Sequence, residues 1–212
     1  MGIGHLAVGF ASKRWAPRTS LAWLMVAPIF VDLWWGLFIL TGVEHARITP
    51  GITKAIPLDL YDIPWSHSVP ATLAWAALFA GIYLALHKQW RVAALLFAGV
   101  CSHWVLDWVT HRPDMPIGLH GPYVGLGLWN HPLLACAVEA GMLAGGAALY
   151  LTSTQPRNRR GILITVAVML VISTAAYFGP PPSDIRVMAA MNLSLLALIW
   201  LLQRFEGQAP LI

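Results

Sequence analysis

Six stretches of the chain are apolar and long enough to cross a lipid bilayer, and this pattern restricts the fold more than any other feature. A membrane-spanning helix needs about 20 predominantly apolar residues. Because a backbone in lipid must satisfy its own hydrogen bonds, each stretch is expected to be helical. The sequence therefore predicts one all-α, polytopic transmembrane domain over residues 1–212, with spans at about 19–41, 66–87, 91–111, 129–152, 161–178 and 186–204.

The amino-acid composition agrees with a membrane protein. Hydrophobic residues make up 58% of the chain and charged residues only 10%, whereas soluble domains carry about 25% charged residues. The net charge of +4 comes from basic residues in the segments between the apolar stretches, where Lys and Arg set the orientation of membrane proteins. We therefore expect the lipid bilayer as a partner, and no nucleic acid.

Lys and Arg are unevenly divided between the two ends of the predicted helices. Cytoplasmic segments of membrane proteins carry an excess of these residues. With six spans, this rule predicts that both termini are cytoplasmic. The nine basic residues on the terminal side are Lys13, Arg14, Arg18, Lys88, Arg91, Arg157, Arg159, Arg160 and Arg204, and the four on the opposite, external side are Arg47, Lys54, Arg112 and Arg186.

An N-terminal segment, 3–15, is apolar at first, is too short to span, and ends near Lys13 and Arg14. This pattern is typical of an interfacial helix or a re-entrant half-helix. In the re-entrant arrangement, which we favour, ten helical residues cover about 15 Å and bring His5 to the middle of the membrane. In the interfacial arrangement His5 stays far from the interior.

The third span carries an unusual polar stripe. His103, Asp107 and His111 are four residues apart in turn, so they share one face of a helix. Their neighbours are Val, Leu and Trp. Ionisable groups at such depth are costly and are usually kept for function. The stripe therefore marks the candidate functional site.

Other spans carry polar residues at a similar depth. In the predicted orientation, Asp32 of the first span, His67 at the start of the second, and His131 and Glu139 of the fourth all fall in the outer half of the membrane. Independent spans need not agree in this way. The agreement predicts that these residues form one cluster.

Three carboxylates of this predicted cluster, those of Asp32, Asp107 and Glu139, have no Lys or Arg in the core of any span to pair with. A buried carboxylate must take up a proton or find a cation. Neutral histidines beside carboxylates are typical ligands of divalent first-row metals, above all zinc. Several carboxylates among histidines suit a site with two ions bridged by an aspartate, or a site that binds manganese.

Each of these residues also has a purely structural interpretation. Asp32 would then be a polar contact between helices, and His67 would cap the second span. Glu139 would be a proton-relay acid or a protonated packing residue. His111 and His131 would simply be exposed near the water interface. Solvent exposure is the expected state of the remaining loop histidines His45, His87 and His120.

The chain also resembles the membrane-bound metal-dependent hydrolases, a family that includes a LexA-regulated bacterial inner-membrane protein. The resemblance covers nearly the whole chain and is most specific over residues 1–140. It is carried by Gly4-His5, Asp32, Ser66-His67-Ser68 and Ser102-His103-x-x-x-Asp107, and, for a longer bacterial branch of the family, by Thr110-His111-Arg112-Pro113-Asp114 and Gly125-Leu126-Gly127-Leu128-Trp129-Asn130.

That family is placed near the zinc-dependent phospholipase C and single-strand nuclease superfamily, helical enzymes with clustered zinc ions. The soluble enzymes carry a later His-x-x-x-Glu pair, whereas His131 and Glu139 are eight residues apart here. The resemblance therefore implies one or two zinc ions rather than three, a bacterial inner membrane, and a hydrolase of unspecified substrate. It implies as metal ligands His5, Asp32, His67, His103 and Asp107.

The leading hypothesis is a membrane-embedded hydrolase that acts on an ester or phosphoester through a metal-activated water in the outer half of the bilayer. Glu139 or His111 would act as general base or complete the metal shell, and Arg112 would clamp an anionic group. A site at this depth favours a lipid or lipid-linked phosphoester, although a soluble substrate could enter from outside.

Two other functions use the same residues. A transporter of protons or divalent cations would need access from both sides, but no polar residues continue into the inner half and no repeat is present. A non-catalytic membrane scaffold would use the cluster only to fix helix packing. The sequence is compatible with a single copy and with a homo-oligomer.

Overall fold

The structure confirms an all-α polytopic fold. A computed structural model describes residues 1–207, and six segments in this part are long and apolar enough to span a membrane. Their ends differ from the predicted ones by no more than three residues. The first comprises α2 (Leu21–Val26), the 3-10 turn η2 (Ala27–Ile29) and α3 (Phe30–Thr41), and the others are α5 (Val69–His87), α6 (Trp90–Thr110), α7 (Pro132–Ser153), α8 (Arg159–Phe178) and α9 (Ile185–Glu206).

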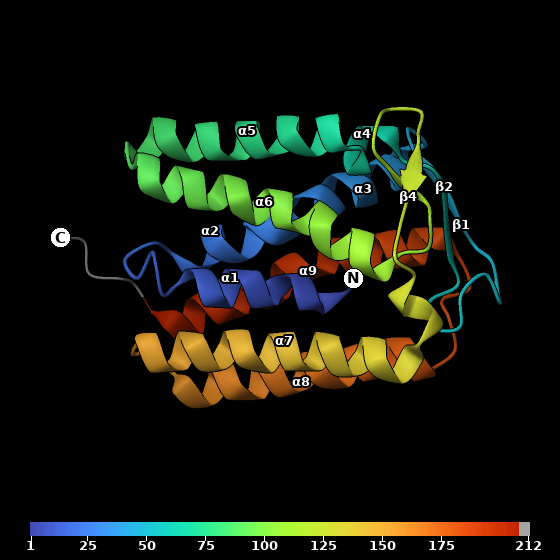
Figure 1. Ribbon diagram of the computed structural model, residues 1–212. Helices are drawn as coiled ribbons and strands as arrows, with labels where there is room; N and C mark the ends of the chain where they lie inside the picture. Colours follow the sequence, from blue (N-terminus) through green and yellow to red (C-terminus); the bar gives the residue numbers. More distant parts are fainter. Residues whose placement is uncertain (208–212) are drawn as a thin grey trace.

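The helices pack in three groups (Figure 1). The α5–α6 pair lies on one side and the α7–α8 pair on the other, with α2, α3 and α9 between them. Large apolar side chains remain exposed along the outer faces, among them Leu133, Leu163 and Val171. Such faces are stable in lipid rather than in water, so the molecule is built for a bilayer.

The N-terminal segment lies inside this bundle, as the re-entrant arrangement predicts. The turn η1 (Ile3–His5) and α1 (Leu6–Ser12) lie between α6 and α7, with the N-terminus near the centre of the bundle (Figure 1). Glycines allow this close packing. A side chain at Gly9 would meet the Leu24 carbonyl at 2.7 Å, and one at Gly146 of α7 would meet the Ala7 carbonyl at 2.5 Å.

Gly146→Leu should therefore displace α1 and destabilise the protein. The added Cβ would overlap the backbone of α1, and overpacking of this kind costs about 1–3 kcal/mol. The matched control is Gly145→Leu, because a Cβ at Gly145 meets nothing within 4 Å. Thermal unfolding in detergent should show a lower midpoint for Gly146→Leu only. Equal midpoints for the two variants would contradict this packing.

A proline interrupts the first span next to α6. Pro28 lies in η2, and it has no backbone N–H with which to continue an α-helix. Helix α6 crosses η2 closely at Gly99, where a Cβ would lie 3.1 Å from Ala27. One turn after Gly99, the Nδ1 atom of His103 donates to the Pro28 carbonyl at 2.8 Å. The interruption thus supplies the contact that orients this histidine.

Short hairpins and turns cover the end of the bundle opposite the C-terminal end of α9 (Figure 1). The predicted spans leave 42–65 and 112–128 as connecting segments, so the two-stranded pairings are an addition to the predicted fold. They are held by few hydrogen bonds and leave the fold class unchanged. These elements are β1 (His45–Ile48), β2 (Leu58–Asp62), α4 (Pro64–His67), β3 (Met115–Pro116), β4 (Tyr123–Val124) and η3 (Leu128–Asn130).

Candidate metal centre

The five side chains predicted as metal ligands come together at the centre of the bundle. They form two groups that share His103, one with Asp32 and His67 and the other with His5 and Asp107, and the ligand atoms of each group lie within 4.8 Å of one another. The residues come from η1, α3, α4 and α6. Their convergence is confirmed, and the binding of a metal remains a prediction.

The first group has the dimensions of a metal site. The Nε2 atoms of His67 and His103 are 3.3 Å apart, and the Oδ1 atom of Asp32 lies 3.7 Å from each. A triangle with edges of about 3.6 Å has its centre about 2.1 Å from each corner, and zinc binds imidazole nitrogen and carboxylate oxygen at about that distance. One divalent ion therefore fits between these three atoms.

Asp107 joins the two groups through its two oxygens. Its Oδ2 lies 3.0 Å from His103 Nε2 and 3.6 Å from His67 Nε2. Its Oδ1 lies 3.0 Å from His5 Nε2, and it also contacts the nitrogen of Met1. The His5 ring stacks on that of His103 with centroids 4.0 Å apart. This placement suits a carboxylate that bridges two ions.

The hydrogen bonds made by the Nδ1 atoms of His103 and His67 indicate that the Nε2 atoms of these rings carry lone pairs. The Pro28 carbonyl can only accept a hydrogen bond, so His103 Nδ1 must be the donor. His67 Nδ1 lies 2.7 Å from the Ser66 hydroxyl. In neutral imidazoles with protonated Nδ1, both Nε2 atoms present lone pairs to each other and to two carboxylates. Lone pairs and carboxylates that face one another in this way need a proton or a cation between them.

The Met1 ammonium supplies one positive charge, because it forms an ion pair with Asp107, but no basic side chain of the described residues does so. Within residues 1–207, neither Asp32 nor Asp107 forms an ion pair with Lys or Arg. Access is also limited, because the side chains of His5 and His103 are fully buried and that of Asp32, the most accessible of the five, is 14% exposed. A bound ion would be held almost entirely by protein atoms.

Glu139, predicted as a base or an additional ligand, holds the N-terminal segment instead of facing the five residues. It is buried, and its carboxylate accepts hydrogen bonds from the Gly4 N–H and the Tyr177 hydroxyl, each at 2.8 Å. Gly4 precedes His5 directly. Glu139 therefore positions the segment that brings His5 to the cluster.

The two other predicted catalytic residues lie at the outer edge of the cluster. His111 follows the last residue of α6 in an extended conformation, and its Nε2 lies 3.8 Å from Asp107 Oδ1. Its Nδ1 lies 3.2 Å from the carboxylate of Asp114. Arg112 forms ion pairs with Asp59 and Asp114. Its guanidinium is thus engaged with two carboxylates rather than directed at the five ligands.

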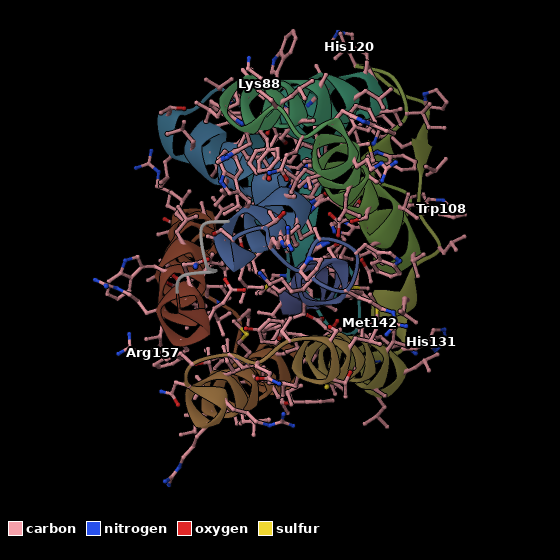
Figure 2. All side chains as sticks on the ribbon, turned by 90° about the vertical axis from the view of Figure 1, so that its left-hand side faces the viewer. Lys88, Trp108, His120, His131, Met142 and Arg157 are labelled. Atoms are coloured by element: carbon pink, nitrogen blue, oxygen red, sulfur yellow. The ribbon has the colours of Figure 1, made fainter. Side chains whose placement is uncertain are left out.

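Other polar residues lie away from the cluster. His131 is exposed and lies at the periphery of the molecule (Figure 2), so the prediction that His131 joins the cluster is wrong. It precedes Pro132, the first residue of α7, and faces outward. Ser68, rather than His67, caps the second span, since its hydroxyl accepts from the Ala71 N–H at 3.3 Å. His67 is thereby left free to face inward.

Glu44 and Pro28 contact the candidate ligands or their neighbours but are not among the residues predicted from the sequence. Glu44 is buried and bonded to Ser66, and Pro28 provides the carbonyl that binds His103. The position of Glu44 just after an apolar span gave no signal, because Glu is mostly exposed and its burial appears only in the structure. The role of a backbone carbonyl leaves no signal either.

Comparisons with protein-family models, with curated proteins and with solved structures find no match to this chain. The geometry of the cluster therefore carries the functional argument.

Proposed function

We propose that this protein is a membrane-embedded, metal-dependent hydrolase with one or two divalent ions, most simply zinc, held by His5, Asp32, His67, His103 and Asp107. The observation that supports it best is the triangle of Asp32, His67 and His103, whose ligand atoms surround a point at zinc-binding distance. The chemistry of the donors agrees, since imidazole and carboxylate are common zinc ligands.

A bound zinc ion would supply an activated water by lowering its pKa to about 7. The chain itself contributes a dry, shaped site and a nearby base. Of the predicted catalytic residues, His111 suits proton transfer best, because its Nδ1 is held by Asp114 and its Nε2 lies beside Asp107. Glu139 serves better as the residue that positions His5, and Arg112 as a tie between Asp59 and Asp114.

The proposed substrate is an ester or phosphoester, and a lipid or lipid-linked one fits the location best. Asp32 lies near the middle of a segment long enough to span a bilayer, and Asp107 lies in the last turn of another. The resemblance to the membrane-bound metal-dependent hydrolases supports the same class of reaction. It also supports the localisation that we propose, a bacterial inner membrane with both termini cytoplasmic and the site towards the external side.

The packing below the cluster favours an enzyme over a transporter. Many of the residues that pack between the cluster and the opposite end of the bundle are apolar, among them Phe10, Leu21, Met25 and Leu143. The buried Lys13 at that end is paired with Glu206. A cation pathway through the membrane requires polar groups or water along its length. A hydrolase needs no such pathway across the membrane.

The test is to purify the protein, measure its metal content, and assay it against carboxylic esters, phosphomonoesters, phosphodiesters and fluorogenic phospholipids. We expect stoichiometric metal and hydrolysis of at least one class, lost after chelation and restored by zinc. Zinc flux into liposomes without hydrolysis would overturn the proposal in favour of a transporter. Absence of metal would overturn it in favour of a scaffold.

A further inference from the structure

A buried carboxylate outside the five candidate ligands contacts one of them through a single hydroxyl group. Glu44 follows Gly42, whose left-handed conformation (φ 76°) ends α3, and it precedes strand β1. Its relative exposure is 1%. Within residues 1–207 it forms no ion pair with Lys, Arg or His. A carboxylate buried this deeply requires other partners.

Those partners are three hydrogen-bond donors from α4. One oxygen of Glu44 accepts from the backbone N–H groups of Trp65 and Ser66, each at 2.7 Å, and the other accepts from the Ser66 hydroxyl at 2.6 Å. The same hydroxyl oxygen lies 2.7 Å from His67 Nδ1. Glu44, Ser66 and His67 thus form a continuous chain that leads from the linker to the cluster.

The direction of these bonds follows from the number of protons. A serine hydroxyl has one proton, and here it is donated to the Glu44 carboxylate. The Ser66 oxygen must therefore accept the proton of His67 Nδ1. Nδ1 is then protonated, and Nε2 presents its lone pair to His103 and Asp107. This is the form of histidine that binds a metal through Nε2.

We propose that Glu44 is a positioning residue that acts through Ser66 to hold His67 in the Nε2-binding form and orientation. The inference rests on the proposed metal site and adds a residue outside its ligands. Carboxylates that orient metal-binding histidines raise their basicity, and loss of such a partner typically weakens metal affinity about 10–100-fold.

The other histidines of the cluster are anchored differently. His103 is held by the Pro28 carbonyl, which no side-chain substitution removes, and the Nδ1 atom of His5 has no hydrogen-bond partner among the described residues. Of the two histidines grouped with Asp32, His67 is therefore the one whose orientation depends on neighbouring side chains. Burial raises the pKa of Glu44, and the hydrogen bonds from Ser66 and Trp65 oppose that rise.

Two substitutions test the chain of hydrogen bonds. Ser66→Ala removes one oxygen and leaves both backbone bonds to Glu44 in place. Glu44→Gln keeps the shape, but its NH₂ group must face Ser66, because its single oxygen is needed by the two backbone N–H donors. The Ser66 hydroxyl would then donate to His67 Nδ1 and shift the ring proton to Nε2.

The matched control is Ser102→Ala. Ser102 also precedes a candidate ligand directly, His103, but its hydroxyl donates to the Gly99 carbonyl within its own helix. Ser66→Thr, which keeps the hydroxyl, should retain the cobalt affinity and absorption of the unsubstituted protein. If Glu44→Gln does not fold, Ser66→Ala with these two variants still tests the inference.

The measurements are cobalt affinity, the visible absorption of the cobalt-loaded protein, and the ¹⁵N shifts of the His67 ring in metal-free protein. We expect 10–100-fold weaker cobalt binding and altered absorption for Ser66→Ala and Glu44→Gln, with the His67 ring proton moved to Nε2 in Glu44→Gln. Unchanged affinity and spectra in both variants would overturn the inference and leave the proposed function standing. If the unsubstituted protein binds no cobalt, both fall.

Discussion

Asp107→Ala should abolish stoichiometric metal binding. Asp107 approaches His103 and His5 at 3.0 Å and His67 at 3.6 Å, so its removal takes a ligand from one group and the carboxylate that joins it to the other. Loss of a residue that only supports a ligand already costs about 10–100-fold in affinity, and loss of this carboxylate should cost more than about 100-fold. Elemental analysis of the purified variant provides the measurement.

His103→Ala should have the same effect, because His103 belongs to both groups. Asp62→Ala is the control. Asp62 is a half-exposed carboxylate that pairs with His45 at the surface and contacts none of the five residues. Stoichiometric metal that survives in both Asp107→Ala and His103→Ala would refute the site. Metal lost from Asp62→Ala as well would point to general misfolding.

Glu206→Gln should be the most destabilising single change at the opposite end of the bundle. Lys13, which follows α1, is almost fully buried and forms an ion pair with Glu206 at the end of α9. Its ammonium group also donates to the Thr19 carbonyl, and Glu206 accepts from the Leu21 N–H at 2.8 Å. Removal of one partner of a buried ion pair costs about 3–5 kcal/mol, because the other charge remains buried.

The double variant Lys13→Met/Glu206→Gln should recover most of that loss, since replacing both charges of a buried pair is often neutral. Arg157→Ala is the control, because this residue lies at the surface of the same end (Figure 2). Thermal unfolding in detergent should rank Glu206→Gln below the double variant and Arg157→Ala near the unsubstituted protein. A double variant less stable than Glu206→Gln would contradict the uncompensated-charge explanation.

The spans were predictable because their signal is local. An apolar length of about 20 residues is set by the bilayer, and it appears in the sequence wherever a helix crosses. The i, i+4 spacing of His103 and Asp107 likewise follows from helix geometry alone. The positions of Asp32 and His67 at a shared depth were inferred by counting residues along helices, and the structure brings these four together.

Residue spacing was a poorer guide where the chain leaves regular helix. The sequence predicts that His131 and Glu139 join one cluster, but His131 precedes Pro132 and is exposed, whereas Glu139 contacts Gly4 and Tyr177. The pairing of Arg112 with Asp59 joins residues 53 positions apart. Hairpin and loop conformations depend on such distant contacts, so no local pattern could place these side chains.

The sequence by itself determined the class of the molecule, the six spans, and the four ligand candidates that lie in or beside them, because bilayer thickness and helical periodicity act on each segment independently. The tertiary structure alone decided that α1 enters the bundle, that Asp107 faces both groups, and that Glu44 reaches His67 through Ser66. These contacts depend on how closely helices approach each other. For α1 that approach is set at Gly146, where a missing Cβ lets the Ala7 backbone come close, and for α6 at Gly99, which packs against the Ala27 side chain.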